Sequence, residues 1–376
     1  MGNCVFEIHV HEDEENYDNP ITPTIPKSKL KINNDIKSDE ELFIKSIEKS
    51  SSLGTYINVS DYKKIVKPNI LKYIETHKLN YQEYFNFSSP NIYKANPMQF
   101  QNGNVYYGNW NENGEMEGYG IYFIKNKNVI TEGIWKKGNN IFGRIFFPNG
   151  DIYEGDIKNS LPHGVGTMEM INGERYKGDF IEGNMTGRGT YIFQDKSYYC
   201  GEIENGIFKG EGSMKWNNET EYHGNFVNSS LQGKGKMYNN IIGEKYIGNF
   251  NKNEFDGIGI YYYKNGDIYE GNFDFGKKEG EGKYKRNDNV EFDLIWNNDL
   301  PNGKGFATLK QNKIKGLWRN GNILEIEIIK GNLDNFSEIN LNVKPCDRTL
   351  CPSSLPHLEI YENDEISQFV IGTSLI

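Results

Sequence analysis

Two residues near the start of the chain have the types and the spacing that suit covalent lipid attachment. The sequence begins Met1-Gly2-Asn3-Cys4, so removal of the methionine exposes the glycine that N-myristoylation requires, and a cysteine two residues later could carry a palmitoyl chain. The common motif has Ser or Thr where this chain has Phe6. A single myristoyl chain binds a membrane only marginally, so stable attachment needs the second chain at Cys4. We favour acylation of Gly2 and Cys4 over an unmodified start with a reduced thiol.

Charge does not supply the second membrane anchor. Residues 12–15 are all acidic, and an anionic leaflet repels acidic groups. The basic residues Lys27, Lys29 and Lys31 come later and are few. Attachment would therefore depend on the acyl chains, and we predict a peripheral, lipid-anchored protein on the cytoplasmic face of a membrane.

No constellation in the sequence predicts catalysis, a metal site or a cofactor. The histidines are dispersed, and for His163 and His223 we predict a solvated or packing role. The paired glycines never extend to Gly-x-Gly-x-x-Gly, and a phosphate-binding loop of the Gly-x-x-x-x-Gly-Lys-[Ser/Thr] type is missing. Cys346 and Cys351 could bridge or bind metal, but without a nearby pair of histidines we favour free thiols. Carboxylates such as Glu281 are interpreted as solubilising charges.

The elements that carry these residues come from a repeat. The pattern Tyr-x-Gly-x-[aromatic or Ile], followed by Gly-x-Gly, returns about every 23 residues between Asn102 and roughly Gly316. Side chains of a strand alternate between its two faces, so Tyr, Gly and the aromatic residue share one face. The short polar stretch before the paired glycines has the length of a hairpin loop, and each repeat is therefore predicted to be one β-hairpin.

Between repeats, Asn-Gly pairs such as Asn172-Gly173 and Asn265-Gly266 precede the tyrosine by four residues. We expect them to form type I′ turns, whose two central residues both have positive φ. About nine hairpins are predicted, and Ile314 to Trp318 would begin a tenth that does not close.

Glycine weakens a strand, so its regular recurrence needs a physical reason. Aromatic rings can lie over the bare backbone and fill the missing volume, which makes one face of the sheet a ladder of rings and glycines. We predict that this face binds partners through the following residues: Tyr106, Trp110, Trp135, Tyr153, Tyr176, Phe180, Tyr199, Tyr222, Phe226, Tyr246, Phe250, Tyr269, Phe273, Trp296 and Trp318.

The repeated pattern, from Tyr106-x-Gly108-x-Trp110 onward, resembles the MORN repeat. This resemblance implies an elongated single-layer antiparallel sheet of repeated hairpins, used for protein assembly, membrane attachment or cytoskeletal organisation. Departures occur at Thr131, Ile145, Phe292 and Leu294, and the repeats that contain them should be irregular. Similar repeats are fused to phosphatidylinositol phosphate kinases and histone methyltransferases, but the flanks of this array leave no room for either catalytic domain.

Four segments follow from this interpretation. Residues 1–37 form a flexible tether, 38–100 a short helical region, 101–322 the repeat array, and 323–376 a C-terminal extension. Within the second segment we predict helices over 39–49 and 61–77, the latter broken or restarted at Pro68, which either cap the first edge of the sheet or form a partner-binding bundle. Strands over 358–361 and 366–371 would form a closing hairpin.

Composition sets limits on the partners. Aromatic residues make up 14% of the chain but hydrophobic residues only 36%, so rings must carry the burial. Residues 101–330 hold 28 basic and 31 acidic residues, a net charge of −3, which argues against nucleic acid. No apolar run approaches the length that spans a bilayer, so we expect a cytoplasmic chain. We therefore predict a non-enzymatic scaffold for protein partners, with self-association possible; the alternative is a module for phosphoinositide or other lipid binding, related to the lipid kinases but without a catalytic domain.

Overall fold

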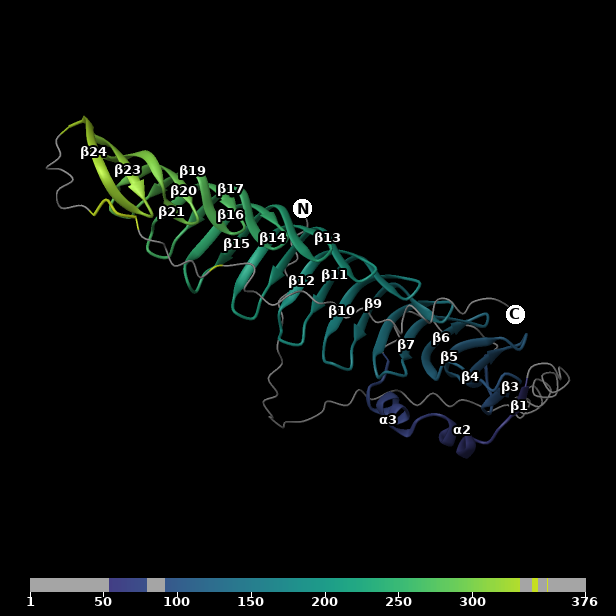
Figure 1. The fold of residues 1–376 in the computed structure, drawn as a ribbon. Coiled ribbons are helices and arrows are strands. Elements are labelled where there is room, and N and C mark those ends of the chain that lie inside the picture. The colour runs from purple at the N-terminus through teal and green to yellow at the C-terminus, as the bar shows by residue number, and fades with distance from the viewer. Residues whose placement is uncertain (1–53, 80–91, 332–339, 344–349, 351–376) are drawn as a thin grey trace, which may run out of the picture. The chain divides into compact units, whose positions relative to one another are not determined.

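The computed structural model describes residues 54–79, 92–331, 340–343 and 350, and the chain divides into two compact units, residues 1–138 and 139–376 (Figure 1). Both units consist mainly of antiparallel strands, as the sequence predicts. The first unit contains β1 (Gly54–Tyr56), α2 (Val59–Ile65), α3 (Pro68–Thr76), β2 (Ile92–Lys94), β3 (Met98–Phe100), β4 (Val105–Asn111), β5 (Met116–Ile124) and β6 (Val129–Lys136).

The predicted helix over 61–77 is present as two helices that meet at the proline. α3 starts at Pro68, because a proline at the first helical position loses no hydrogen bond and has a suitable φ. The side chain of Asn58 caps α2 by accepting the N–H of Asp61 at 2.9 Å. The ring of Tyr62 on α2 lies 5.1 Å from that of Tyr107 on β4. This helix therefore covers a face of the sheet, whereas the edge of β4 is paired with β2 and β3.

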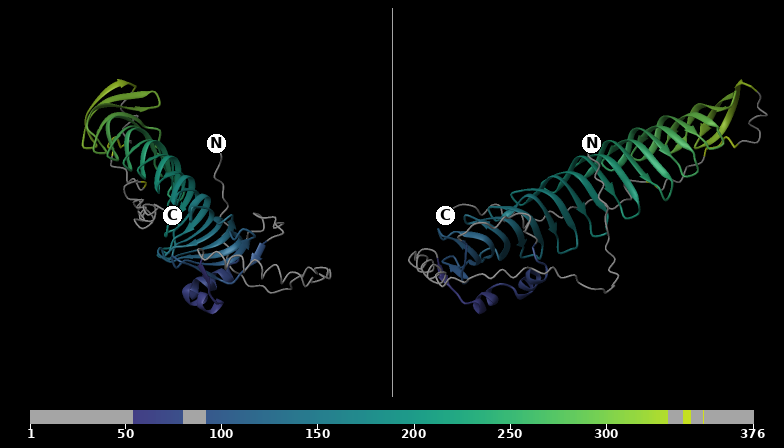
Figure 2. Two further views of the ribbon diagram at one scale, coloured as in Figure 1. Left: turned by 90° about the vertical axis from the view of Figure 1, so that its right-hand side faces the viewer. Right: turned by 180° about the vertical axis from the view of Figure 1, so that it is seen from behind.

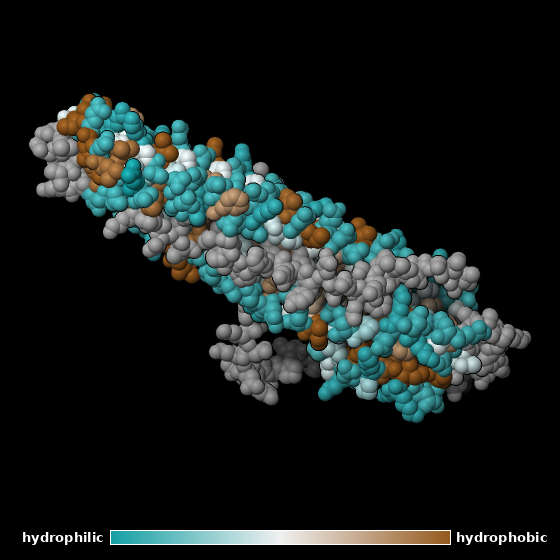
Figure 3. Space-filling view, in the orientation of Figure 1, coloured by the Kyte–Doolittle hydropathy of each residue, from teal (hydrophilic) through white to brown (hydrophobic). Residues whose placement is uncertain are grey.

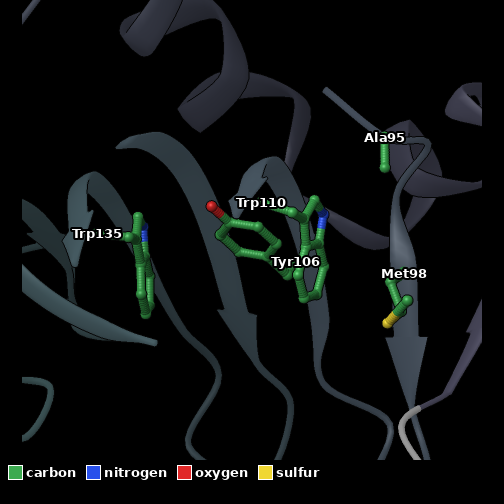
Figure 4. Close-up of a cluster of buried hydrophobic side chains, with 5 residues drawn as sticks. All are labelled: Ala95, Met98, Tyr106, Trp110 and Trp135. Carbon is green, nitrogen blue, oxygen red and sulfur yellow. The ribbon is translucent and has the colours of Figure 1, made fainter. Parts of the chain in front are cut away.

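That arrangement corrects the expectation that helices cap the first edge. The backbone groups at a sheet edge need partners in register, which strands supply and the side of a helix does not. On the opposite face of the same strands, Figure 4 shows the ring of Tyr106 between the indoles of Trp110 and Trp135. Its centroid lies 5.0 Å and 5.4 Å from theirs, and Met98 of β3 completes this buried cluster.

The second unit continues the hairpins in chain order (Figure 2, right). Its strands are β7 (Asn139–Phe146), β8 (Ile152–Lys158), β9 (Leu161–Glu169), β10 (Arg175–Ile181), β11 (Asn184–Ile192), β12 (Tyr198–Glu204), β13 (Ile207–Lys215), β14 (Thr220–Val227), β15 (Ser230–Asn239), β16 (Glu244–Asn251), β17 (Glu254–Tyr262), β18 (Ile268–Asp274), β19 (Lys277–Lys285), β20 (Glu291–Asn297), β21 (Leu300–Pro301), β22 (Gly303–Leu309), β23 (Asn312–Arg319) and β24 (Asn322–Lys330).

A row of glycines crosses the strands of this unit at one register position. Gly178 of β10 pairs with Gly166 of β9 on one side and with Gly189 of β11 on the other. The same pairing of glycine with glycine is repeated without a break from Gly143 to Gly282, where Leu294 takes the next place. The regular spacing of these glycines in the sequence therefore reflects the register in which the strands pair.

Beside this row, each regular hairpin contains a bulge at the first glycine of its Gly-x-Gly pair. The register between β10 and β11 shifts after Gly178, and Gly187 and Arg188 have no direct partner on β10. Gly187 has φ +68°, and a Cβ there would lie 2.4 Å from Oδ2 of Asp179. Glycine is needed here for both its backbone conformation and its size, and the bulge increases the local twist.

The turns differ from the sequence-based prediction. Positive φ at both central residues, the mark of a type I′ turn, occurs at the hairpin tips, for example at Asn159-Ser160 and Asn228-Ser229. At the Asn-Gly pairs between repeats, such as Asn172-Gly173 and Asn265-Gly266, only the glycine has positive φ, as at Gly173 with +88°. There the N–H of Gly173 donates to Met170 O at 2.9 Å, which closes a three-residue loop. The type I′ assignment to Asn-Gly was wrong because the side chain of the asparagine accepts a backbone N–H two residues on and fixes a different turn.

Two repeats are irregular where the sequence departs from the pattern. The repeat with Thr131 and Ile145 is divided between the two units, and both residues are fully buried. At Leu294 the partner strand is split into β21 and β22. The prediction that the tenth hairpin stays open is wrong, because β24 pairs with β23 along its length.

Several predicted features lie outside the described residues. These are the acylation site at Gly2 and Cys4, the tether, the helix over 39–49, the thiols of Cys346 and Cys351, and the strands over 358–361 and 366–371.

The close contact between ring and glycine leads to a stability test. A Cβ at Gly189 would lie 2.4 Å from Cε2 of Tyr176, so Gly189→Ala should destabilise the sheet by about 2 kcal/mol. In a Tyr176→Ala background this penalty should largely disappear. Gly173→Ala is the matched control, because its Cβ would meet nothing within 4 Å and its cost should be the same in both backgrounds. Urea unfolding followed by circular dichroism measures all of these changes; equal penalties for Gly189→Ala with and without the ring would contradict the contact.

Candidate docking site

Within each unit, the aromatic residues predicted from the repeat lie on one face of the sheet, which we call the ring face. Its members are the fifteen aromatic residues that the sequence singles out, in both units, and every one is at most 3% exposed. In this conformation the rings are buried and form the core of the sheet. A partner would therefore contact the residues that surround the rings. Their assignment as binding residues stays a prediction.

The first tyrosine of each repeat is held by two contacts that the sequence spacing fixes. The ring of Tyr176 lies over Gly178 on its own strand and Gly189 on the next. Its hydroxyl donates to the backbone carbonyl of Asp179, three residues on, at 3.1 Å. The equivalent bond runs from Tyr153 to Asp156 O at 2.6 Å and recurs in the other regular repeats. Burial raises the pKa of the Tyr176 hydroxyl well above its ordinary value.

Rings of successive repeats meet edge to face along the second unit. Tyr222 lies 5.2 Å from Phe226 of its own strand and 5.0 Å from Phe250 of the next repeat, at angles of 88° and 81°. Such pairs contribute about 0.5–1.5 kcal/mol beyond the area that they bury. The ladder therefore couples each hairpin to its neighbour.

A second set of ring-face residues was missed from the sequence. Phe208 and Phe255 stack on the repeat tyrosines, with centroids 3.7 Å and 3.9 Å apart. Lys278 occupies the corresponding place in a later repeat, is 1% exposed, and has its Nζ 4.3 Å from the centroid of Trp296. These residues follow the hairpin tip by two positions, and that spacing could have identified them.

The sequence-based analysis also missed a row of buried polar residues two positions before the repeat tyrosines. Glu174 accepts the hydroxyl of Tyr191 at 2.6 Å, and Glu244 accepts that of Tyr261 at 2.8 Å. Asp151 accepts the N–H of Ile171 in the following turn at 2.9 Å. The members of this row in the second unit, all at most 7% exposed, are Asp151, Glu174, Ser197, Thr220, Glu244 and Asp267. The row follows directly after the turns between repeats, and at Asp151, Glu174 and Asp267 the preceding pair is Asn-Gly, a signal that was available in the sequence.

Residues from the C-terminal segment contact the ring face. The indole N–H of Trp318 donates to Leu341 O at 3.1 Å, and the N–H of Leu350 donates to Oε2 of Glu244 at 3.0 Å. The N–H of Val343 donates to the carbonyl of Gly321 at 2.8 Å. Leu341, Val343 and Leu350 are at most 7% exposed. The face thus accepts main-chain groups and aliphatic side chains from a segment outside the repeats.

The other face, here called the outer face, carries a different cluster. Oγ of Ser213 lies 2.7 Å from Nδ1 of His223, whose Nε2 lies 3.3 Å from the hydroxyl of Tyr238. Burial and a hydrogen bond to Glu221 raise the pKa of Tyr238 to about 12. These side chains lie on an open sheet surface, and their bonds connect three neighbouring strands. The side chain of His223 is 48% exposed, and the solvated or packing role stays a prediction.

Two properties can be stated for the described residues alone. Among them, no three His, Cys, Asp or Glu side chains are grouped so that they could hold a metal ion. Their helices are too short to cross a membrane.

Comparison with known families identifies the repeat. The family model for the MORN repeat matches eight segments, residues 106–129, 153–175, 176–198, 199–221, 222–240, 246–268, 269–290 and 295–310. The chain belongs to the MORN-repeat proteins. The stretches that this MORN array leaves unmatched include the departures at Thr131, Ile145, Phe292 and Leu294. The MORN repeat is a non-catalytic repeat module that serves in protein scaffolds.

Other comparisons give distant likenesses. No curated protein matches this MORN-repeat chain. The TCP10 domain of Danio rerio CPAP is 12% identical with a TM-score of 0.31, and the match covers 48% of this chain and 84% of that one. The same domain in complex with a peptide of Danio rerio STIL is 10% identical with a TM-score of 0.34, over 54% of this chain and 92% of that one.

The buried tyrosines of the MORN array predict alkaline unfolding. Burial raises the pKa of Tyr106, Tyr176, Tyr222 and Tyr246 above 10, the ordinary value that they regain in the unfolded chain. A raised folded-state pKa means that this stability is fully present below pH ~10 and is lost as the pH rises above it. Absorbance of tyrosinate should therefore appear together with the loss of circular dichroism, and Tyr176→Phe should make the loss less steep. Titration of these tyrosines near pH 10 with unchanged circular dichroism of the sheet would contradict their burial.

Proposed function

We propose that this protein is a non-enzymatic scaffold that docks extended segments of partner proteins against its ring face. The observation that supports this most is the contact of its own residues Leu341, Val343 and Leu350 with that face. A segment without the repeat pattern is accepted there through main-chain bonds and aliphatic side chains. Partner segments of similar character would be held in the same way.

The chemistry of these contacts defines the occupant. The bonds to Trp318 and Glu244 use the main chain of the incoming segment, so they place few demands on its sequence. Selectivity would come from the positions whose side chains are buried, as for Leu341 and Leu350. Each fully buried aliphatic side chain contributes about 1.5–3 kcal/mol. A segment with aliphatic residues at suitable spacing is therefore favoured over a charged one.

A protein partner fits the charge of the array better than an anionic lipid. Residues 101–330 carry a net charge of −3, and acidic side chains such as Glu174 and Asp267 line the ring face. A negative headgroup would be repelled there. The alternative function, binding of phosphoinositides or other lipids by a module without its own catalytic domain, therefore ranks second.

We further propose that acylation of Gly2 and Cys4 holds the scaffold at the cytoplasmic face of a membrane. The support is the sequence Met1-Gly2-Asn3-Cys4 alone. The tether that follows would leave the array free to reach partners near the surface.

Docking can be tested with a peptide that spans residues 338–352. Full-length protein with Val343→Asp and Leu350→Asp should release its own segment, because two charged groups would have to be buried. This variant should bind the labelled peptide at least about tenfold more tightly than the wild type does, as measured by fluorescence anisotropy. A peptide with Leu341→Asp and Leu350→Asp is the control and should bind neither protein. Absence of peptide binding to the released variant would refute ring-face docking.

Membrane attachment is tested separately. Gly2→Ala should move the protein from the membrane fraction to the soluble fraction, and Cys4→Ser should do so in part, because one chain binds marginally. Asn3→Ala, between the two sites, should leave the distribution unchanged. Identical fractionation of the Gly2→Ala variant and the wild type would remove the anchor from the proposal without affecting peptide docking.

A further inference from the structure

The last strand of the second unit has one partner strand. β24 spans nine residues and pairs with β23 along its length. Among the described residues, no strand pairs with its other side. The N–H of Ile323 donates to Oδ1 of Asn342 at 3.0 Å, so the open edge begins at Leu324.

This edge is unusually apolar for an exposed strand. Leu324, Ile326, Ile328 and Ile329 are 46–55% exposed. Ile328 pairs with Ile314 of β23, which is 1% exposed, so the same face is buried one strand earlier. Figure 3 shows apolar residues gathered at the end of the molecule where Figure 1 places β24.

Native proteins usually protect such an edge. The outermost strands of the first unit, β1 and β2, contain three residues each, and short edge strands offer few groups for pairing. β24 is longer than these strands and contains no proline, and its charged residues are Glu325, Glu327 and Lys330. An apolar edge of this length is typical of a docking surface.

Two acidic side chains on β24 favour a basic segment over a second copy of this chain. Glu325 and Glu327 pair with Leu317 and Lys315, so both lie on the outer face, and Glu327 is 3.9 Å from the Lys315 ammonium. In an antiparallel pair of two β24 strands centred on Ile326, Glu325 of each copy would lie directly opposite Glu327 of the other. Like charges in that position destabilise a pair of strands. A second copy is therefore disfavoured, and basic side chains at alternate positions are favoured.

We infer that the open edge of β24 binds an extended segment of a partner protein that alternates aliphatic residues with Lys or Arg. The segment adds to the sheet as a further strand, its main chain pairs with β24, and its aliphatic side chains cover Ile326 and Ile328. Its basic side chains lie beside Glu325 and Glu327. This surface begins beyond Ile323, whose N–H bonds to Asn342, and it does not include the contacts of Leu341 with Trp318 or of Leu350 with Glu244.

The probe is a short synthetic peptide that alternates lysine and valine, titrated against the full-length protein by fluorescence anisotropy. Glu325→Lys with Glu327→Lys should weaken its binding at least about tenfold, because two attractive pairs become repulsive. The same variant should gain binding of a peptide that alternates glutamate and valine. Glu270→Lys with Glu281→Lys makes an equal change of charge on strands that are paired on both sides, and should leave both affinities unchanged.

Further measurements decide between occupants. Ile326→Ser with Ile328→Ser should abolish binding of the lysine–valine peptide and leave docking of the 338–352 peptide unaffected, which separates this edge from the ring face. The inference is overturned if the wild type does not bind the lysine–valine peptide, or if both charge variants bind it equally. It is also overturned if sedimentation shows a dimer of the wild type that the serine variant lacks, since the occupant is then a second copy.

Discussion

The contact between a tyrosine ring and two bare glycines is the constraint on which the rest of this sheet depends. The ring of Tyr176 occupies the space that side chains at Gly178 and Gly189 would need, and its hydroxyl is satisfied by Asp179 O. A side chain on either glycine would expel the ring, and loss of the ring would leave the glycines uncovered. Each regular repeat therefore keeps all three residues, which explains why the spacing persists while the other positions vary.

In the regular repeats of the second unit, this contact places the core on one face. Rings, glycines and buried polar residues occupy the ring face, while the outer-face row that pairs Cys200, Ser213 and His223 carries no structural requirement of that kind. Residues there are free to differ between repeats. A cluster such as that around His223 can arise on this face without cost to the fold, so its presence does not by itself indicate catalysis.

The sequence predicts the hairpins, their register and the aromatic core because the residues that determine them recur. The Asn-Gly turns were assigned the wrong type, since the side-chain acceptor of Asn172 competes with the preference of the pair for positive φ. The tenth hairpin was missed because Ile326 stands where a glycine is expected. The C-terminal contacts could not be predicted: Leu341 and Leu350 follow no period, and their place depends on Trp318 and Glu244, far away in the sequence.

The buried carboxylates explain why a sheet made of repeats can still offer distinct sites. A buried carboxylate must be satisfied by hydrogen bonds. Glu174, Glu244 and Asp267 each accept the hydroxyl of a tyrosine on the next strand, whereas Asp151 accepts a backbone N–H. Glu174 is satisfied by Tyr191 of its own hairpin, whereas Glu244 also accepts the main-chain N–H of Leu350. The polar position is thus satisfied within the hairpin at Glu174, whereas at Glu244 it also accepts a group from a segment outside the repeats. In the repeat with Met214 on the second strand, the polar position is held by Ser197; in the repeat with Met168 it is held by Asp151, which accepts the N–H of Ile171 instead. Variation at the polar position therefore changes which hydrogen-bonding groups a repeat can accept.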